Sequence, residues 1–283
     1  MPTKTILVTG CSAGGIGAAV ALALAKRAHH VFATARSVSR IPPELSRLSN
    51  VTVLPLDVTS PSSVAQAAQA VAASGRQLDV LVNNAGVGHT MPILDLDVDA
   101  AKRTYDINVF GVIRMVQAFA DMLIQSKGRV VNLSTCGAAS NSPWFSPYTS
   151  SKAALTTTSE TLRLELSPFG VSVVTIMTGI VNTHFHANEP DFILPEGSRY
   201  EPIKEIVTSW ATGESKPSGG SAEQFAESIL GDIVGDGKGG VVWRGRYAGS
   251  TRFFVNWLPT WCQDLGAYLG YGLKELAQKT AAK

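Results

Sequence analysis

The amino-acid sequence predicts a single α/β domain in which helices cover both faces of a parallel β-sheet. Short apolar runs rich in β-branched residues alternate with longer segments of helical composition along nearly the whole chain of 283 residues, and such alternation is typical of βαβ units. We find no internal repeat and no linker that would divide the chain. Because this length suits one domain with a sizeable core, we expect the whole of 1–283 to form a single domain.

The expected elements follow in chain order. The apolar runs predict strands at 4–9, 30–35, 51–56, 78–82, 128–133, 171–177 and 240–243. Composition and periodicity predict helices at 15–28, 60–73, 97–125, 147–167, 221–235 and within 250–278. Residues 184–220 are rich in Pro, Glu, Gly and Ser, and an irregular segment of that length in a compact domain is often functional.

A glycine-rich turn follows the first predicted strand. The sequence Gly10-Cys11-Ser12-Ala13-Gly14-Gly15-Ile16-Gly17 separates that strand from an Ala/Leu-rich helix. Strand, glycine loop and helix in this order are typical of a dinucleotide site, since glycines let the backbone approach a pyrophosphate and the helix N-terminus stabilises its charge. The pattern therefore predicts a Rossmann-type, doubly wound sheet with the nucleotide at the carboxyl ends of its strands. Its candidate contacts are Gly10, Ser12, Gly15 and Ile16. A purely structural tight turn is the alternative.

Tyr148 and Lys152 are the candidate catalytic pair. They are four residues apart in a predicted helix, so both side chains leave the same face. A phenol ordinarily loses its proton near pH 10, and a fixed ammonium one turn away favours the phenolate. Such a phenol is a general acid or base suited to a carbonyl or an alcohol. An isolated pair at this spacing is usually an exposed helical pair, but here it accompanies a glycine loop.

Three further segments extend the pattern. Asp57 follows the third predicted strand, Asn83-Asn84-Ala85-Gly86 follows the fourth, and Asn108 lies in the next helix. Together with the glycine loop and Tyr148/Lys152, these residues resemble the short-chain dehydrogenase/reductase superfamily over about residues 4–185. The resemblance implies that Tyr148 donates a proton, that Lys152 assists it and holds the nicotinamide ribose, and that Asn108 holds a water linked to Lys152.

The same resemblance implies the remaining cofactor contacts and the position of the substrate. Asp57 and Val58 would face the adenine, and Asn84, Ala85 and Gly86 would lie beside its ribose. Gly179, Val181 and Thr183 would meet the nicotinamide end. The segment 184–220 would cover the substrate.

The sequence departs from the family pattern in two places. Gly10 and Gly17 are separated by six residues rather than five, and the pair Gly14-Gly15 can absorb the additional residue without steric conflict. Thirteen residues before Tyr148 the family has Ser, whereas this chain has Thr135, with Ser134 immediately before it. Thr keeps the hydroxyl group but has a stiffer first torsion. We therefore assign the substrate hydrogen bond to Thr135, with Ser134 as the alternative.

We expect NADP(H) rather than NAD(H). Sites for NAD place an acid at the end of the second strand to bind the ribose 2′-hydroxyl. Here Ala35 and Arg36 occupy that position, and no Asp or Glu lies between Val31 and Pro43. A guanidinium suits a 2′-phosphate, and Ser12 would add a hydroxyl contact.

A finer resemblance concerns the branch of the family. The chain is similar to the fungal NADPH-dependent 1-acyldihydroxyacetone-phosphate reductases in five segments. These are the longer glycine loop, Ala33–Arg36, Pro143-Trp144, Thr178-Gly179 and Trp243-Arg244-Gly245. The substrate implied is a mostly apolar small molecule, either an acyl-lipid precursor or a fungal natural-product intermediate. The competing hypothesis is a non-redox scaffold or pathway cyclase that retains the nucleotide fold, and the Thr135 substitution is the only feature that favours it.

Composition narrows the function and the location. A net charge of +2 argues against a nucleic-acid partner. No run of about 18 apolar residues is found, which argues against a spanning helix. Three scattered cysteines suit a reducing compartment, and the first strand begins close to Met1, so we expect a cytoplasmic protein without a signal segment. His184 and His186 have no obvious third ligand, so we expect loop or pocket-lining side chains and no metal. His89 would line the pocket or a plain loop.

The C-terminal extension, residues 244–283, is aromatic. Trp257, Trp261, Phe253 and Phe254 are interleaved with arginines such as Arg252. Rings mixed with cations suit a membrane interface, but equally a lid over the pocket or a subunit contact. We expect residues 250–278 to form an apolar helical extension that either caps the pocket or touches a membrane or lipid-droplet surface. The resemblance also leaves a homo-oligomer open.

Overall fold

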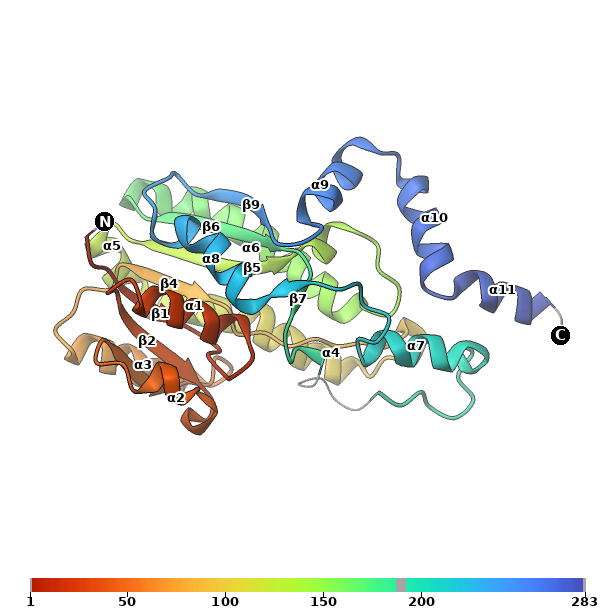
Figure 1. Cartoon of the computed structure of the whole chain (residues 1–283), viewed down its shortest axis with the longest axis horizontal. Helices are drawn as coiled ribbons and strands as arrows, with labels where there is room; N and C mark the ends of the chain where they lie inside the picture. Colours follow the sequence, from red (N-terminus) through yellow and green to blue (C-terminus); the bar gives the residue numbers. More distant parts are fainter. Residues whose placement is uncertain (1, 187–191, 282–283) are drawn as a thin grey trace.

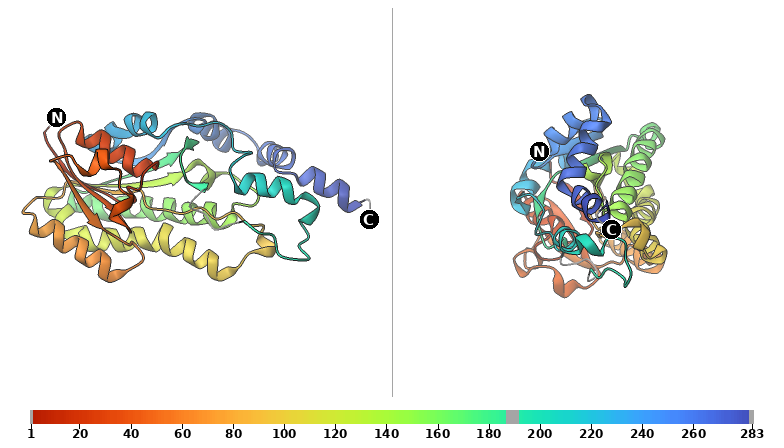
Figure 2. Two further views of the ribbon diagram at one scale, coloured as in Figure 1. Left: turned by 60° about the horizontal axis from the view of Figure 1, so that its bottom comes forward. Right: turned by 90° about the vertical axis from the view of Figure 1, so that its right-hand side faces the viewer.

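The computed structural model describes residues 2–186 and 192–281. Within them a seven-stranded parallel sheet has the order β3-β2-β1-β4-β5-β6-β9, and Figure 2 shows helices on both of its faces. The strands are β1 (Thr5–Val8), β2 (His30–Ala35), β3 (Val51–Pro55), β4 (Val80–Asn83), β5 (Arg129–Thr135), β6 (Ser172–Thr178) and β9 (Gly240–Arg244). Each overlaps a predicted strand, so the predicted doubly wound α/β fold is confirmed. The chain reverses its winding direction between β1 and β4, which is where such sheets bind ligands.

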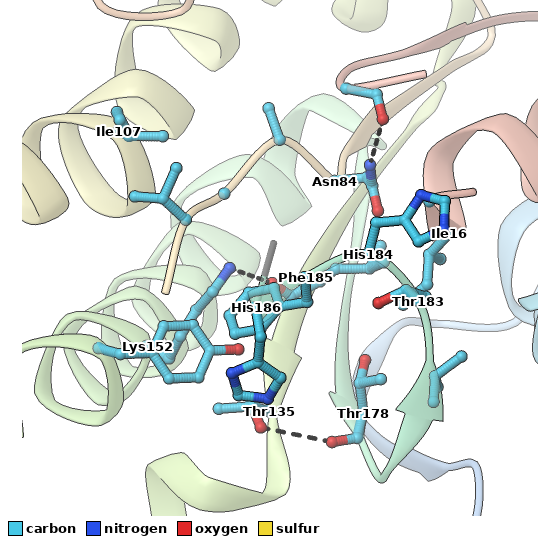
Figure 3. Close-up of a pocket in the computed structure, with 18 of the residues that line it drawn as sticks. Ile16, Asn84, Ile107, Thr135, Lys152, Thr178, Thr183, His184, Phe185 and His186 are labelled. Carbon is cyan, nitrogen blue, oxygen red and sulfur yellow. Dashed lines mark hydrogen bonds between the residues drawn. The ribbon is translucent and has the colours of Figure 1, made fainter. Parts of the chain in front are cut away.

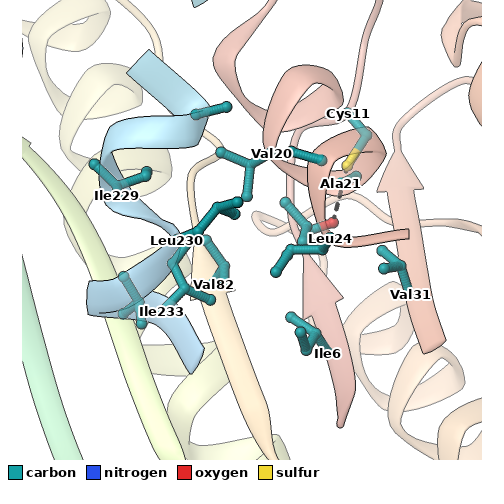
Figure 4. Close-up of a cluster of buried hydrophobic side chains, with 14 of the residues drawn as sticks. Ile6, Cys11, Val20, Ala21, Leu24, Val31, Val82, Ile229, Leu230 and Ile233 are labelled. Carbon is teal, nitrogen blue, oxygen red and sulfur yellow. Dashed lines mark hydrogen bonds between the residues drawn. The ribbon is translucent and has the colours of Figure 1, made fainter. Parts of the chain in front are cut away.

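Two apolar layers enclose the sheet. On one face α1 (Ile16–Ala25) and α8 (Ala222–Val234) pack together over the strands, and Figure 4 shows Val20 and Leu24 of α1 directed toward Leu230 of α8. The short α2 (Pro43–Ser46) joins this layer through Leu45. The other face is covered by α3 (Pro61–Ala73), α5 (Gly111–Ser126) and α6 (Ser146–Leu166). The central strands, such as β1, β2 and β4, are buried on both sides, which explains their continuous apolar runs, whereas the edge strands β3 and β9 are only partly buried.

The predicted helix 97–125 is divided by a wider turn. The helix α4 (Val98–Tyr105) leads into a π-helical turn, η3 (Asp106–Phe110), and continues as α5. By length and composition alone the run Val98–Ser126 could cross a membrane, whereas no such helix was predicted from the sequence. However, Met115, Phe119 and Leu123 of its buried face pack against the sheet, and core helices of globular proteins meet the same criterion.

The segment 184–220 is more regular than predicted. It contains η7 (Glu201–Ile203) and α7 (Lys204–Ala211), and β7 (Val181–Asn182) pairs with β8 (Gly220–Ser221) at its borders. Val207 of α7 packs in a buried apolar cluster with Ile203 and Trp144, and Ala211 is buried as well, which stabilises the helix. That burial comes from tertiary packing, so composition alone did not predict it. Residues 187–191 of this segment lie outside the described residues.

The chain ends in three helices that return to the body of the protein. They are α9 (Ala248–Trp257), α10 (Thr260–Gly270) and α11 (Leu273–Ala281), and Figure 1 shows them curving from the end of β9 toward α7. At one end Ala248 is buried beside Cys136 and Met177. At the other end the indole of Trp144 donates a hydrogen bond to the carbonyl oxygen of Tyr271 (3.1 Å). The predicted helical extension is present, although it consists of three short helices.

Candidate active site

The glycine loop forms a cradle at the N-terminus of α1. Gly10 and Gly14 have positive φ angles of 74° and 72°, which favour glycine over other residues. A Cβ atom at Gly14 would also collide with the imidazole of His184. A Cβ atom at Gly17 would collide with the backbone of Gly10 and the amide of Asn84. The N-cap Gly15 offers no side-chain cap to α1, so the first backbone N–H groups of this fully described helix are available to an anion.

Hydrogen bonds join this loop to the end of β4. The hydroxyl oxygen of Thr9 accepts bonds from the backbone N–H groups of Asn84 (3.0 Å) and Ala85 (2.9 Å). The side-chain amide of Asn84 donates to the carbonyl oxygen of Thr9 (2.8 Å). These bonds fix the segment Asn84–Gly86 beside the cradle. A Cβ on Gly86 would lie only 3.3 Å from Nζ of Lys152, so glycine lets this segment lie close to the lysine.

Two arginines border the far end of the cavity. Arg36 follows β2 directly, and Arg40 lies one turn later; both are exposed and both line the cavity together with Ser12. The backbone N–H of Ala13 donates to the carbonyl oxygen of Arg40 (2.9 Å), which holds this arm against the glycine loop. Arg36 was predicted as a cofactor contact, whereas Arg40 was not. The sequence feature that could have indicated Arg40 is that it is a second arginine in the stretch between Val31 and Pro43, which has no acidic residue.

Asp57 and Val58 line the same end of the cavity. The carboxylate of Asp57 accepts hydrogen bonds from the backbone N–H (2.9 Å) and the hydroxyl (2.7 Å) of Thr59. This Asx-type turn fixes the direction of the chain after β3. Both residues therefore lie in the cavity, and their contact with the adenine stays a prediction.

Tyr148 and Lys152 project from α6 into the central part of the cavity. The ammonium group of Lys152 is buried and donates to the carbonyl oxygen of Leu133 (2.8 Å). Burial lowers the pKa of Lys152 to about 8, because a low-dielectric environment disfavours the charged form. The ring of Tyr148 packs against the ring of Phe185 at a centroid distance of 5.2 Å. Figure 3 shows Lys152 and Thr135 on one side of this space and Ile16 and His184 toward the other.

The hydroxyls of Ser134 and Thr135 have different surroundings. The hydroxyl of Ser134 is buried, donates to the carbonyl oxygen of Lys152 (3.2 Å) and lies 2.7 Å from the hydroxyl of Thr156. The hydroxyl of Thr135 is half-buried and makes longer bonds, with the N–H of Gly137 (3.3 Å) and the carbonyl oxygen of Thr178 (3.5 Å). Thr135 is therefore the better placed of the two to exchange a weak internal bond for a substrate oxygen. The adjacent Cys136 is buried, and burial raises the pKa of its thiol to about 12, so it stays protonated.

Asn108 lies in the π-helical turn. Its side-chain oxygen accepts from the backbone N–H of Val87 (2.9 Å), and its amide donates to the hydroxyl of Ser151 (3.0 Å). The turn is held from outside by Arg114, whose guanidinium contacts the carboxylate of Asp106 at 2.6 Å. Single π-helical turns of this kind are frequent at functional sites. Asn108 thus connects the chain after β4 to the helix that carries Tyr148 and Lys152.

The last predicted contacts lie after β6. Gly179, Val181 and Thr183 all line the cavity. A Cβ atom at Gly179 would collide with the carbonyl group of Arg246, which accounts for glycine at this position. The cavity that contains every predicted site residue except Asn108 has a volume of about 650 Å³.

Several wall residues were not named individually as site residues. Trp210 of α7 and Tyr271 line the cavity, and their rings stack at a centroid distance of 4.3 Å. Phe185, His184 and His186 line it as well, which agrees with the pocket-lining alternative for the two histidines. His89 does not line this cavity; it is buried near the hydroxyl of Thr104 (3.2 Å).

A doubly wound parallel sheet with a glycine cradle, and a Tyr–Lys pair facing the same cavity, define a nucleotide-dependent oxidoreductase. The profile of the short chain dehydrogenase family matches residues 4–192, and the chain belongs to that family.

Similar proteins are found among fungal enzymes. The short-chain dehydrogenase ptmH of Penicillium ochrochloron is 40% identical over 266 residues, which cover 94% of this chain and 97% of that protein. The NADPH-dependent 1-acyldihydroxyacetone phosphate reductase of Schizosaccharomyces pombe is 38% identical over 240 residues, 83% of this chain and 80% of that protein. A crystal structure of an alcohol dehydrogenase from Thermococcus sibiricus, complexed with 5-hydroxy-NADP, superposes with a TM-score of 0.70 at 25% identity and covers 87% of this chain and 98% of that one.

Proposed function

We propose that this protein is an NADP(H)-dependent oxidoreductase that interconverts a ketone or aldehyde and its alcohol on a mostly apolar small molecule. The observation that carries this proposal is the convergence of Tyr148, Lys152 and Thr135 on the cavity that also contains the glycine cradle. Chemistry at a carbonyl needs a proton donor, a charge that stabilises the donor's conjugate base, and a hydrogen bond to the oxygen. The three side chains supply these functions.

The described residues fit an NADP molecule. The uncapped N-terminus of α1 and the Cβ-free positions of the loop suit a pyrophosphate. Arg36 and Arg40, with Ser12, suit a 2′-phosphate at the end of β2. Asp57, Val58 and Asn84–Gly86 would border the adenosine, and Gly179, Val181 and Thr183 the nicotinamide end. A related fungal enzyme is NADPH-dependent by name, which agrees with this preference.

Side chains of the protein transfer the proton to the substrate and stabilise the charge that develops. Bound NADPH supplies the reducing equivalent. Thr135 donates a hydrogen bond to the substrate oxygen, and Tyr148 gives its proton to the alkoxide that develops there. The buried ammonium of Lys152 stabilises the resulting phenolate. Asn108, held by Val87 and Ser151, keeps the π-helical turn in place and would hold the water through which Lys152 is linked to solvent.

The direct test follows NADPH absorbance with a panel of ketones and aldehydes. We expect consumption of NADPH that depends on both the protein and the carbonyl compound, and a much lower efficiency with NADH. Binding of NADPH without consumption for any carbonyl compound would instead favour a scaffold or a cyclase. The intact Tyr148 and Lys152 argue for the oxidoreductase.

The substrate is proposed to be an acyl-lipid precursor or a fungal natural-product intermediate. Fungal relatives support this class, since one of them is a 1-acyldihydroxyacetone phosphate reductase. The cavity supports an apolar ligand, because Phe145, Phe185, Trp210 and Tyr271 form part of its wall.

We further propose a peripheral contact of the tail with a lipid surface in the cytoplasm, on a membrane or a lipid droplet. Phe253, Phe254 and Trp257 of α9 are exposed, with Arg252 beside them. Exposed rings next to cations suit the headgroup region of a bilayer. All three cysteines are free thiols, in keeping with a reducing compartment. A homo-oligomer through the same apolar surface is the competing proposal, and flotation combined with light scattering separates the two.

A further inference from the structure

A second cavity adjoins the active site. It has a volume of about 1010 Å³ and lies between α10 and the chain that leads into α6. The two cavities share Gly137, Ser142 and Thr149 as wall residues. Thr149 directly follows Tyr148, so the second cavity, which we call the α10 groove, begins beside the proposed proton donor.

Gly137 lies at the junction of the two cavities. A Cβ atom at this position would lie 3.3 Å from the methyl group of Thr149 and 3.6 Å from the hydroxyl oxygen of Thr135. A larger side chain would therefore fill the space between these two threonines. Glycine leaves the junction open to a ligand that extends from the active site.

The roof of the groove is one face of α10. Trp261, Leu265 and Tyr268 are spaced four and three residues apart, so they share a helical face, and all three line the groove. They are nevertheless 65%, 50% and 41% exposed. No described segment of the chain covers this apolar face, although Ala248 and Tyr271 anchor the tail to the body on either side of it.

The rest of the lining disfavours an anion. Ile93, Ala138, Pro143 and Trp144 contribute apolar wall, and serine and threonine hydroxyls contribute uncharged polar groups. Asp264 is the one charged residue among the described residues that line the groove. A single carboxylate without a cation repels a phosphate or a carboxylate group. The groove therefore suits an uncharged, extended apolar group.

We propose that the α10 groove binds an uncharged aliphatic chain attached to the substrate carbonyl while that carbonyl lies at Tyr148 and Thr135. This inference rests on the proposed oxidoreductase function and specifies its substrate as a long-chain carbonyl compound. The aliphatic chain of the substrate covers the exposed face of α10 and removes this face from water. Each buried methylene group then strengthens binding by a factor of about four.

The test is a homologous series of straight-chain methyl ketones, from butanone to dodecanone. In the wild type kcat/KM rises by about fourfold per methylene group until the groove is filled. Leu265→Gln lowers this dependence. The matched control is Leu269→Gln: Leu269 lies on the same helix and is 54% exposed but does not line the groove, so its variant keeps the wild-type dependence. The same measurement is made with two series of long-chain ketones, one with and one without a phosphate on the head, and both show the same dependence of kcat/KM on chain length. The ratio of kcat/KM between the two series indicates whether a phospholipid precursor or an uncharged metabolite is the natural source.

A second readout does not depend on turnover. The Kd values of the same ketones for the NADP⁺ complex, measured by calorimetry, fall with chain length in the wild type and in Leu269→Gln but fall less in Leu265→Gln. Equal Kd values along the series, or equal losses in both variants, overturn the groove assignment even if the ketones are reduced. If no ketone is reduced while the Kd values still fall with chain length, the oxidoreductase proposal fails and the groove assignment stands.

Discussion

At the scale of single residues, removal of the phenol oxygen of Tyr148 distinguishes a role in the chemical step from a role in NADPH binding. Tyr148→Phe removes one oxygen atom and leaves the ring contact with Phe185. We expect kcat to fall by about 10²–10⁴-fold, the range contributed by a positioned general acid, whereas the Kd of NADPH stays within about twofold. Fluorescence titration with NADPH supplies the control. Near-normal turnover of this variant would remove Tyr148 from the mechanism.

Lys152 sets the pH dependence on the alkaline side. Its pKa is lowered to about 8 by burial, so the stabilising ammonium is present below that pH and is lost above it. We expect kcat/KM for carbonyl reduction to be flat at lower pH and to fall about tenfold per pH unit above about 8, since kcat/KM reports the free enzyme. Lys152→Arg keeps its charge and shows no such fall, although its plateau is lower. A profile that is identical in both proteins contradicts the assignment.

The same lysine has an opposite effect on stability. In the unfolded chain Lys152 regains its ordinary pKa of 10.5, whereas in the folded protein the pKa is about 8. Between these values the unfolded state binds more protons, so the free energy of unfolding rises with pH. We expect urea midpoints of the wild type to gain on those of Lys152→Met from about pH 8 to about pH 10.5. Parallel midpoints over this window would contradict the lowered pKa.

The two neighbouring hydroxyls are distinguished by their partners. Thr135→Val removes the hydroxyl that faces the cavity, so we expect a loss of kcat of about 10²-fold, as for an oxyanion-hole donor. Ser134→Ala breaks the bonds to Thr156 and to the carbonyl oxygen of Lys152, so we expect a destabilisation of about 1 kcal/mol with activity largely retained. Steady-state kinetics and thermal melting of both variants decide the question; the reverse pattern would transfer the role to Ser134.

At the scale of elements, the arm that follows β2 determines the choice of nucleotide. Arg36 and Arg40 line the same end of the cavity, and a hydrogen bond to a charged group contributes about 1.5–3 kcal/mol. Arg40→Ala should therefore weaken NADPH binding by about tenfold to a hundredfold, and Arg36→Asp should turn the preference toward NADH. The ratio of kcat/KM for NADPH and NADH measures both effects. An unchanged ratio in Arg36→Asp would contradict the assignment.

The elements themselves differ in how far the sequence predicted them. The central strands were predicted because a parallel sheet is buried on both faces, so each of them is a continuous apolar run. The π-helical turn at Asp106–Phe110 was missed, because no proline marks a break in the run 98–126, and the contact of Arg114 with Asp106 across the turn is not visible as a motif in the sequence. The helix α7 was missed because its apolar face is defined by partners such as Trp144.

At the scale of the whole molecule, the predictable part of the site is the part coded by local motifs. The cradle, the Tyr–Lys pair and the arm after β2 each lie within one short segment, so their spacing is visible in the sequence. The aromatic part of the wall is different, because Trp210 and Tyr271 are 61 positions apart in the sequence and meet only through the return of the tail. A single sequence contains no spacing rule for such a contact.

The tail also provides the test of the lipid contact. Trp257 is 77% exposed, and its transfer into a headgroup region would bury a large aromatic surface. We expect the intact protein to float with vesicles that contain anionic lipid, and Trp257→Ser to float less. Leu164→Ser is the matched control, since Leu164 is 63% exposed on α6.

Ending the chain at residue 247 is a harsher change, because it removes Ala248 from its contact with Cys136 and Tyr271 from the cavity wall. This form should lose both flotation and activity. If the intact protein stays in solution, and its mass by light scattering drops from a dimer to a monomer in Trp257→Ser, the exposed rings form a subunit contact and the lipid proposal is wrong.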